Sequence, residues 1–129
     1  MKKVSMSHED YLEAIIILGG TVEAPVRSVD IAKQLDVSKA SVNKAIGLLK
    51  ERGLVDQPYY GDITLTSEGY EYGKAVYKRH KYLTSFLNKA IGIPIEIAEE
   101  EACKMEHAIS DDSFEKWVAY IDGLGLVSE

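Results

Sequence analysis

The sequence of 129 residues predicts a mainly α-helical protein in two parts, one over residues 1–70 and one over residues 71–129. Three observations support this prediction. Apolar residues recur at helical spacing through most of the chain. Two of the helical segments are separated by a very short turn, and a hairpin pattern follows them. Beyond the hairpin the segments are again helical, so the second part is expected to contain helices throughout.

The first predicted helix runs from Ser7 to about Leu18. Ser7 resembles a helix N-cap because an acidic residue, Asp10, follows three positions later. Two consecutive glycines at 19–20 are expected to end the helix. Its apolar face is formed by residues at helical spacing, namely Leu12, Ile15 and Ile16.

The next two predicted helices are short and close together in the sequence. Ser28 is expected to cap a helix that ends at Leu35, and Ser38 to cap a helix that ends at Arg52. Gly53 can then adopt the left-handed conformation that terminates a helix. Two helices with so short a connection are typical of a helix-turn-helix.

A small hairpin is predicted directly after these helices. Residues 54–55 and 63–65 are strand-like, and Pro58 and Gly61 lie between them. A helix-turn-helix followed by a hairpin predicts a winged helix. Many winged helices bind DNA, although some bind only protein.

Three longer helices are predicted in the rest of the chain. Gly92 should separate the first from the second, and Pro94 suits the first turn of the second. Their predicted ranges are about 66–90, 94–109 and 110–123. A winged helix does not need these helices, so we expect them to serve dimerisation and sensing.

Composition and charge restrict the class of protein. The chain has no run of about 18 apolar residues and no signal peptide at its start, so no membrane association is expected. Its single cysteine cannot form an internal disulfide, which fits the cytoplasm. Residues 26–60 carry six basic and four acidic side chains, whereas residues 96–115 carry eight acidic and one basic. The first block can approach phosphates, and the second requires cations or solvent.

The most informative pattern lies between Glu99 and His107. On a helix Cys103, Glu106 and His107 share one face, and Glu99 lies one turn before them. A thiolate, carboxylates and an imidazole on one face suit a divalent transition metal. Two simpler interpretations remain open. A lone cysteine is more often a small buried apolar residue, and acidic residues near a helix N-terminus are favoured by the helix dipole.

Six motifs along the chain can be matched to one family, namely Glu9-Asp-Tyr-Leu-Glu13, Val29-Asp-Ile-Ala, Val37-Ser-Lys-Ala-Ser-Val, Leu65-Thr-Ser-Glu-Gly69, Arg79-His80 and Glu101-Ala-Cys-Lys-Met-Glu-His107. Together they resemble the metal-dependent repressors typified by the diphtheria toxin repressor and the manganese transport regulator. The resemblance covers nearly the whole chain. It implies the compact form of the family, without the C-terminal SH3-like domain of the iron-type members.

The resemblance also implies a set of metal ligands, which are Asp10, Glu13, His80, Glu99, Cys103, Glu106 and His107. Asp10 follows the manganese-type members, and Cys103 follows the iron-type members, so the set is mixed. Thr84 stands where the iron type has an ancillary glutamate, which weakens a second site. The implied cofactor is Fe²⁺ or Mn²⁺, and Zn²⁺, Co²⁺ and Ni²⁺ are expected to bind in vitro.

The helix that follows Ser38 is predicted to enter the DNA major groove. Candidate DNA-binding residues are Arg27, Ser38, Lys39, Ser41, Asn43 and Lys44. For each of them the alternative is a solvated helix face. The iron-type members have glutamine at the position of Lys44, so their base preference cannot be transferred. The implied partners are double-stranded DNA with a pseudo-palindromic operator and a second copy of the chain, which would form a homodimer.

The function predicted from these observations is that of a non-enzymatic transcriptional repressor. It would sense Fe²⁺ or Mn²⁺ and control metal-homeostasis genes. One alternative is a winged-helix regulator that responds to a non-metal signal, with the acidic face merely solvated. The other is a metalloenzyme that uses the histidines, cysteine and carboxylates, although the sequence supplies no evident substrate pocket or oxyanion donors.

Overall fold

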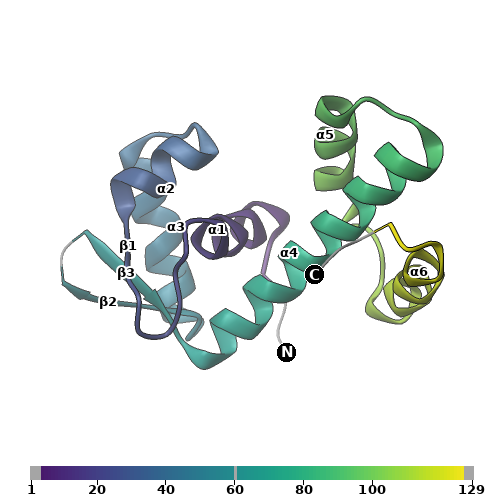
Figure 1. Ribbon diagram of the computed structural model, residues 1–129. Coiled ribbons are helices and arrows are strands. Elements are labelled where there is room, and N and C mark those ends of the chain that lie inside the picture. The colour runs from purple at the N-terminus through teal and green to yellow at the C-terminus, as the bar shows by residue number, and fades with distance from the viewer. Residues whose placement is uncertain (1–3, 60, 127–129) are drawn as a thin grey trace. The chain divides into compact units, whose positions relative to one another are not determined.

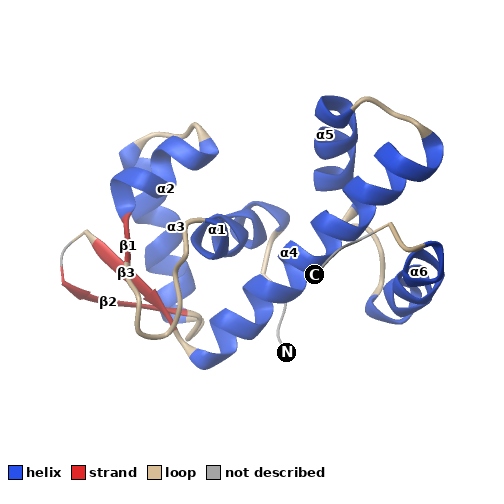
Figure 2. Cartoon of the chain, in the orientation of Figure 1, coloured by secondary structure: helices blue, strands red, loops and turns tan. Residues whose placement is uncertain are grey.

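The computed structural model describes residues 4–59 and 61–126 (Figure 1). It divides into two compact units, Met1–Val76 and Tyr77–Glu129. Both this division and the boundary predicted after residue 70 fall within one helix, α4 (Ser67–Ser85). Helices dominate both units, and strands are described in the first (Figure 2). The predicted mainly α-helical class is confirmed.

The first unit contains the predicted helix-turn-helix and wing. Its elements before α4 are α1 (Met6–Ile17), β1 (Val26–Arg27), α2 (Ser28–Leu35), α3 (Lys39–Glu51), β2 (Val55–Tyr59) and β3 (Asp62–Leu65). The strands form an antiparallel sheet in the order β1-β3-β2. Strand β1 is absent from the prediction, because two residues are too few to show an alternating pattern. The β2–β3 register shifts between Asp56 and Tyr59, where Pro58 has no N–H to donate.

The starts predicted for two helices were wrong. The N-cap of α1 is Ser5 and not Ser7, since the Ser5 hydroxyl oxygen accepts a hydrogen bond from the His8 N–H at 3.2 Å. Ser28 is the first residue of α2, and the residue before it, Arg27, occupies the N-cap position. Arg27 also pairs with β3, so the strand leads directly into the helix.

The α2–α3 turn and the ends of α3 follow the prediction. Asp36 adopts a left-handed conformation with φ of 54° after α2. Ser38 caps α3, because its hydroxyl oxygen accepts from the Ser41 N–H at 3.0 Å. Gly53, with φ of 74°, follows the end of α3. The N-terminal turn of α3 is therefore fixed locally, and the rest of the helix is fixed by its buried residues Val42, Ala45, Ile46 and Leu49.

One apolar core joins these elements to the first half of α4. Its fully buried members include Leu12, Ile15, Ile31, Val42, Leu49, Ile63 and Leu65. Thr66 precedes α4 and caps it, since its hydroxyl accepts from the Gly69 N–H at 3.0 Å and donates to the Gly53 carbonyl at 2.7 Å. A Cβ atom at Gly69 would lie 1.8 Å from the Leu54 carbonyl oxygen. Only glycine allows this approach of α4 to the start of the wing.

We therefore expect Gly69→Ala to lower the free energy of unfolding by about 3 kcal/mol, the upper end of the usual cost of overpacking. Chemical denaturation followed by circular dichroism measures this change. Gly47→Ala is the matched control, because a Cβ atom at this position of α3 would meet no described atom within 4 Å outside the backbone of its own helix. The control should gain up to about 1 kcal/mol, as alanine favours helix. Equal stability of the two variants would contradict the close approach.

The second unit consists of the second half of α4 and three further elements, η1 (Phe86–Ile91, a π-helix), α5 (Ile95–Met105) and α6 (Asp111–Leu124). Its core contains Leu83, Leu87, Ala98, Ala102 and Phe114. Gly92, with φ of 91°, separates η1 from α5 as predicted. Among the described residues, no helix combines the length and apolar character needed to cross a membrane.

The end predicted for α5, near Ile109, was wrong. Regular helix ends at Met105, and a turn leads from there to Ser110, which caps α6 by accepting from the Ser113 N–H at 3.1 Å. In this turn the carbonyls of Glu106 and Ile109 accept hydrogen bonds from the Arg79 guanidinium. A side chain from α4 therefore satisfies two carbonyls of the turn that follows the helix.

Candidate metal centre

Three of the predicted ligands gather at the end of α5 in the second unit. Cys103 lies in the last turn of the helix, and Glu106 and His107 follow directly after it. Glu106 keeps helical backbone angles, φ of −59° and ψ of −29°, so the helical spacing extends past the end of the helix. One ligand atom from each of these side chains lies within 4.8 Å of the others.

His80 on α4 also approaches Glu106, in a second group of possible ligands that shares Glu106 with the first. Its Nδ1 atom lies 3.6 Å from Oε2 of Glu106. Nε2 of His107 lies 3.4 Å from the other oxygen, Oε1. The Glu106 carboxyl group is thus positioned between two imidazoles, and the sulfur of Cys103 lies nearby. We call His80, Cys103, Glu106 and His107 the α4–α5 cluster.

Glu106 is the most unusual residue of the α4–α5 cluster. It is only 1% exposed, and neither of its carboxyl oxygens receives a hydrogen bond from the described part of the chain. A buried carboxyl group without hydrogen bonds is costly, so such groups usually pair with cations or bind metals. The hydroxyl of Thr84, one turn after His80, is likewise buried without a hydrogen-bond partner among the described residues. Sulfur, nitrogen and oxygen donors around one carboxyl group fit a divalent transition metal.

Two further predicted ligands lie on α1 in the first unit. Asp10 is half-buried and Glu13 is 8% exposed, and the spacing of three residues places them on the same face of α1. Their neighbour Glu9 accepts a hydrogen bond from the Tyr72 hydroxyl, which also accepts from the Val4 N–H. Tyr72 on α4 therefore holds the start of α1 through two hydrogen bonds, and no sequence pattern indicates this role.

Glu99, the remaining predicted ligand, lies on α5 and is exposed. It is not part of the α4–α5 cluster. Its role as a ligand stays a prediction.

The predicted DNA-binding residues all lie in the first unit, and all are exposed: Arg27, Ser38, Lys39, Ser41, Asn43 and Lys44. Five of them lie at the N-cap or in the first two turns of α3. The hydroxyl of Ser38 donates to that of Ser41 at 2.9 Å, so these two side chains also serve the helix cap. The arrangement leaves the two lysines and Asn43 available to a partner.

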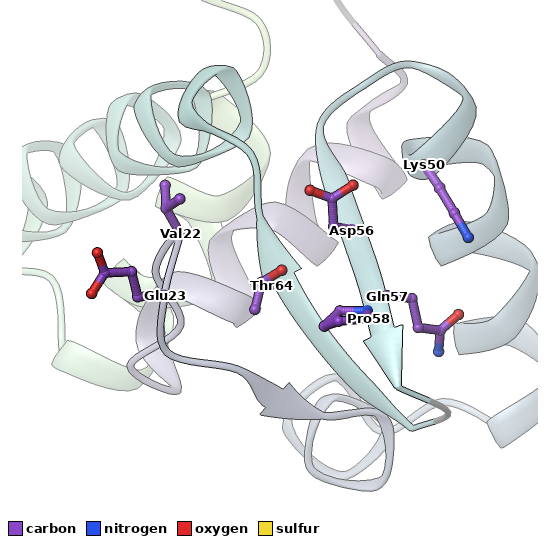
Figure 3. A pocket seen from close by; sticks show the side chains of 7 residues that line it. All are labelled: Val22, Glu23, Lys50, Asp56, Gln57, Pro58 and Thr64. Atoms are coloured by element: carbon purple, nitrogen blue, oxygen red, sulfur yellow. The ribbon is translucent and has the colours of Figure 1, made fainter.

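A hollow of about 530 Å³ lies beside the sheet of the first unit (Figure 3). Its charged side chains come from the loop before β1, from α3 and from β2, and they do not converge on one point (Figure 3). It is lined by Val22, Glu23, Lys50, Asp56, Gln57, Pro58 and Thr64. None of the predicted ligands or DNA-binding residues lines it.

Comparison with protein families gives two matches. A family described as "Iron dependent repressor, N-terminal DNA binding domain" matches residues 3–62. A second, described as "Iron dependent repressor, metal binding and dimerisation domain", matches residues 66–124. The second match contains the whole α4–α5 cluster.

Individual proteins give the same result. An uncharacterised HTH-type transcriptional regulator from Methanocaldococcus jannaschii is 36% identical over 120 residues, which cover 92% of this chain and 95% of that protein. The diphtheria toxin repressor of Corynebacterium glutamicum is 30% identical, with 95% of this chain and 53% of that protein covered. The solved structure of a manganese-dependent transcriptional repressor in complex with manganese has a TM-score of 0.77 at 30% identity, covering 89% of this chain and 52% of that one. The chain thus spans about half the length of the last two proteins.

Proposed function

The chain belongs to the iron-dependent repressor family, and on that basis we propose that it is a transcriptional repressor activated by Fe²⁺ or Mn²⁺. The observation that carries this proposal is the α4–α5 cluster. A fully buried carboxyl group that receives no hydrogen bond from the described residues lies among a thiol and two imidazoles. A metal site accounts for that arrangement better than a solvated acidic face does.

We propose that the cluster residues His80, Cys103, Glu106 and His107 hold the metal, and that Asp10 and Glu13 add carboxylate ligands from α1. The proposal for Asp10 and Glu13 rests on the family resemblance and on the position of both side chains on one face of α1. Glu99 is an additional candidate ligand on the exposed side of α5.

These ligands come from segments far apart in the sequence, and this suggests how metal and DNA binding are coupled. Without a cation, several carboxylates and a thiolate brought together would repel one another. A bound divalent cation supplies the positive charge that offsets this repulsion. The ligands of α1 would then favour one arrangement of the DNA-reading unit, and a difference of a few kcal/mol between arrangements suffices for a switch.

The proposed partner is double-stranded DNA with a pseudo-palindromic operator, bound by a homodimer. Lys39 and Lys44 would contact phosphates, and Asn43 and Ser41 would face base edges. Two copies of α3 would read half-sites about one helical turn apart. Genes of metal homeostasis are the proposed targets. Action in the cytoplasm and the absence of catalysis are part of the same proposal.

Cys103 should decide which metals bind most tightly, since a thiolate favours softer ions than a carboxylate does. We expect Cys103→Ser to weaken Zn²⁺ and Co²⁺ binding at least about tenfold more than Mn²⁺ binding. The thiolate-to-Co²⁺ charge-transfer absorption should disappear. Competition with a chelator of known affinity measures the dissociation constants.

Ser113→Ala serves as a control for a small side-chain change in the same unit, because this exposed residue of α6 lies outside the α4–α5 cluster. Its metal preference should match that of the wild type. An unchanged metal preference in Cys103→Ser would remove Cys103 from the ligand set.

The experiment that tests the proposed function is fluorescence anisotropy of the reduced protein on its own promoter DNA. The protein is titrated anaerobically with Fe²⁺ and with Mn²⁺. A steep gain in DNA affinity, reversed by a chelator, is the expected result, and it also ranks the two ions. Tight DNA binding that ignores both metals would overturn the proposal and favour a regulator with a non-metal signal.

A further inference from the structure

Arg79, the residue before His80, makes several contacts with the turn between α5 and α6 and is largely buried there. One guanidinium nitrogen, Nη1, donates to the Glu106 carbonyl at 2.9 Å and also to the Ile109 carbonyl. The other, Nη2, pairs with the carboxylate of Asp111. The guanidinium lies 5.0 Å from the centre of the Phe114 ring, and the Arg79 side chain is only 12% exposed.

The contacts of Arg79 and His80 converge on one residue from two sides. Arg79 holds the backbone carbonyl of Glu106, and His80 faces the Glu106 carboxyl group at 3.6 Å. Because the two are adjacent on α4, their side chains leave the helix about 100° apart. Arg79 and His80 therefore both link α4 to the turn that carries Glu106.

Besides Arg79, the packing of Met105 and Ile109 against the apolar core of the second unit holds this turn. It contains no glycine or proline, and α5 ends at Met105 without a left-handed residue. The carbonyls of Glu106 and Ile109 both accept from Nη1, and Nη2 faces Asp111, so one planar guanidinium holds three acceptors in fixed positions. A lysine has a single nitrogen on a flexible stem, so it cannot occupy the positions of both Nη1 and Nη2 at the same time.

We propose that Arg79 is a positioning residue for the metal centre, which fixes the backbone of Glu106 so that its carboxyl group lies between His80 and His107. This inference deepens the proposed function and rests on it. The hydrogen bonds of Arg79 described above go to two backbone carbonyls and to Asp111, and not to ligand atoms of the cluster. Its effect on the metal would be exerted through the orientation of Glu106 and His107.

The test compares wild type with Arg79→Lys, which keeps the positive charge and removes the fork. Free Mn²⁺ is quantified by electron paramagnetic resonance, so the readout is metal affinity and not DNA binding. We expect the dissociation constant for Mn²⁺ to rise about 10- to 100-fold, as is usual when a partner that orients a ligand is lost. The absorption spectrum of the Co²⁺-loaded variant should also shift, because the ligand geometry changes.

Two further variants separate positioning from simple stability. Lys78→Met removes an exposed positive charge from the adjacent position of α4 and should leave the Mn²⁺ dissociation constant unchanged. Asp111→Asn removes one partner of the guanidinium while keeping both carbonyl contacts, and should give a smaller rise. This variant also decides the matter if Arg79→Lys does not fold, since an unchanged affinity in Asp111→Asn would then count against the inference.

The possible results are distinguishable. Wild-type protein that binds no Mn²⁺ would overturn the proposed function, and the role of Arg79 with it. Wild-type binding together with an unchanged affinity in a folded Arg79→Lys variant would overturn only the role of Arg79. A variant with lower stability but the same Mn²⁺ affinity would show that the residue serves the fold alone.

Discussion

Glu106→Gln should abolish high-affinity metal binding while making the metal-free protein more stable. The amide has nearly the same size as the carboxyl group but cannot supply the negative charge that a divalent cation requires. In the wild type this group is 1% exposed, and neither oxygen receives a hydrogen bond from the described residues. Burying a carboxylate costs more than burying a neutral amide of the same size, so the exchange should raise the unfolding free energy by about 1 kcal/mol.

Two measurements on the same preparation test this expectation. Equilibrium dialysis against Mn²⁺ reports metal binding, and urea denaturation in the presence of a chelator reports the stability of the metal-free protein. Glu101→Gln is the matched control, because Glu101 carries the same group on the exposed side of α5. It should change neither quantity appreciably. Normal Mn²⁺ binding by Glu106→Gln would remove the central residue from the proposed site.

Asp10→Ala should produce a different defect, in which metal still binds but no longer affects DNA binding. The α4–α5 cluster is untouched by this change and keeps its sulfur, nitrogen and oxygen donors. In the proposed mechanism, however, α1 connects the metal to the DNA-reading unit through Asp10. We therefore expect weaker metal binding, with the metal-induced gain in DNA affinity reduced to about twofold or less, well below the usual range of allosteric coupling.

The two halves of this prediction are measured separately. The Co²⁺ charge-transfer absorption reports whether Cys103 still binds metal, and anisotropy on promoter DNA reports the coupling. Glu23→Ala is the control. Glu23 is an exposed acidic residue of the same unit and lies on the loop before β1. A normal metal response of DNA binding in Asp10→Ala would separate α1 from the sensing mechanism.

The features that could be predicted from the sequence depend on residues close together along the chain. Ser38 and Gly53 mark the ends of α3 through their own backbone preferences, so the helix-turn-helix was predictable. Helical spacing alone brings Cys103, Glu106 and His107 close to one another, so this part of the cluster could be predicted. Ser5 could not be recognised as the cap of α1, because Ser7, with Asp10 three positions later, offers the stronger pattern.

The features that could not be predicted depend on contacts between distant segments. The early end of α5 is associated with hydrogen bonds from Arg79, 27 residues before Glu106. Strand β1 exists because Val26 and Arg27 pair with β3, far along the chain. The buried state of Glu106 likewise arises from packing, and no periodicity distinguishes it from the exposed glutamates of α5. Local patterns therefore indicated which residues have the right chemistry, and packing determined their surroundings.

Glu106 is buried in the folded chain, so the proposed metal site exists only there and metal binding should affect the lifetime of the protein in the cell. A ligand that binds the folded chain and not the unfolded one adds about 2.7 kcal/mol of stability at a concentration 100 times its dissociation constant. A chain that opens more often when metal is scarce is degraded more often, because proteases act on opened states. Under the proposed function, metal depletion would shorten the lifetime of the regulator as well as release its operator. Derepression would then outlast a brief shortage, until new protein is synthesised.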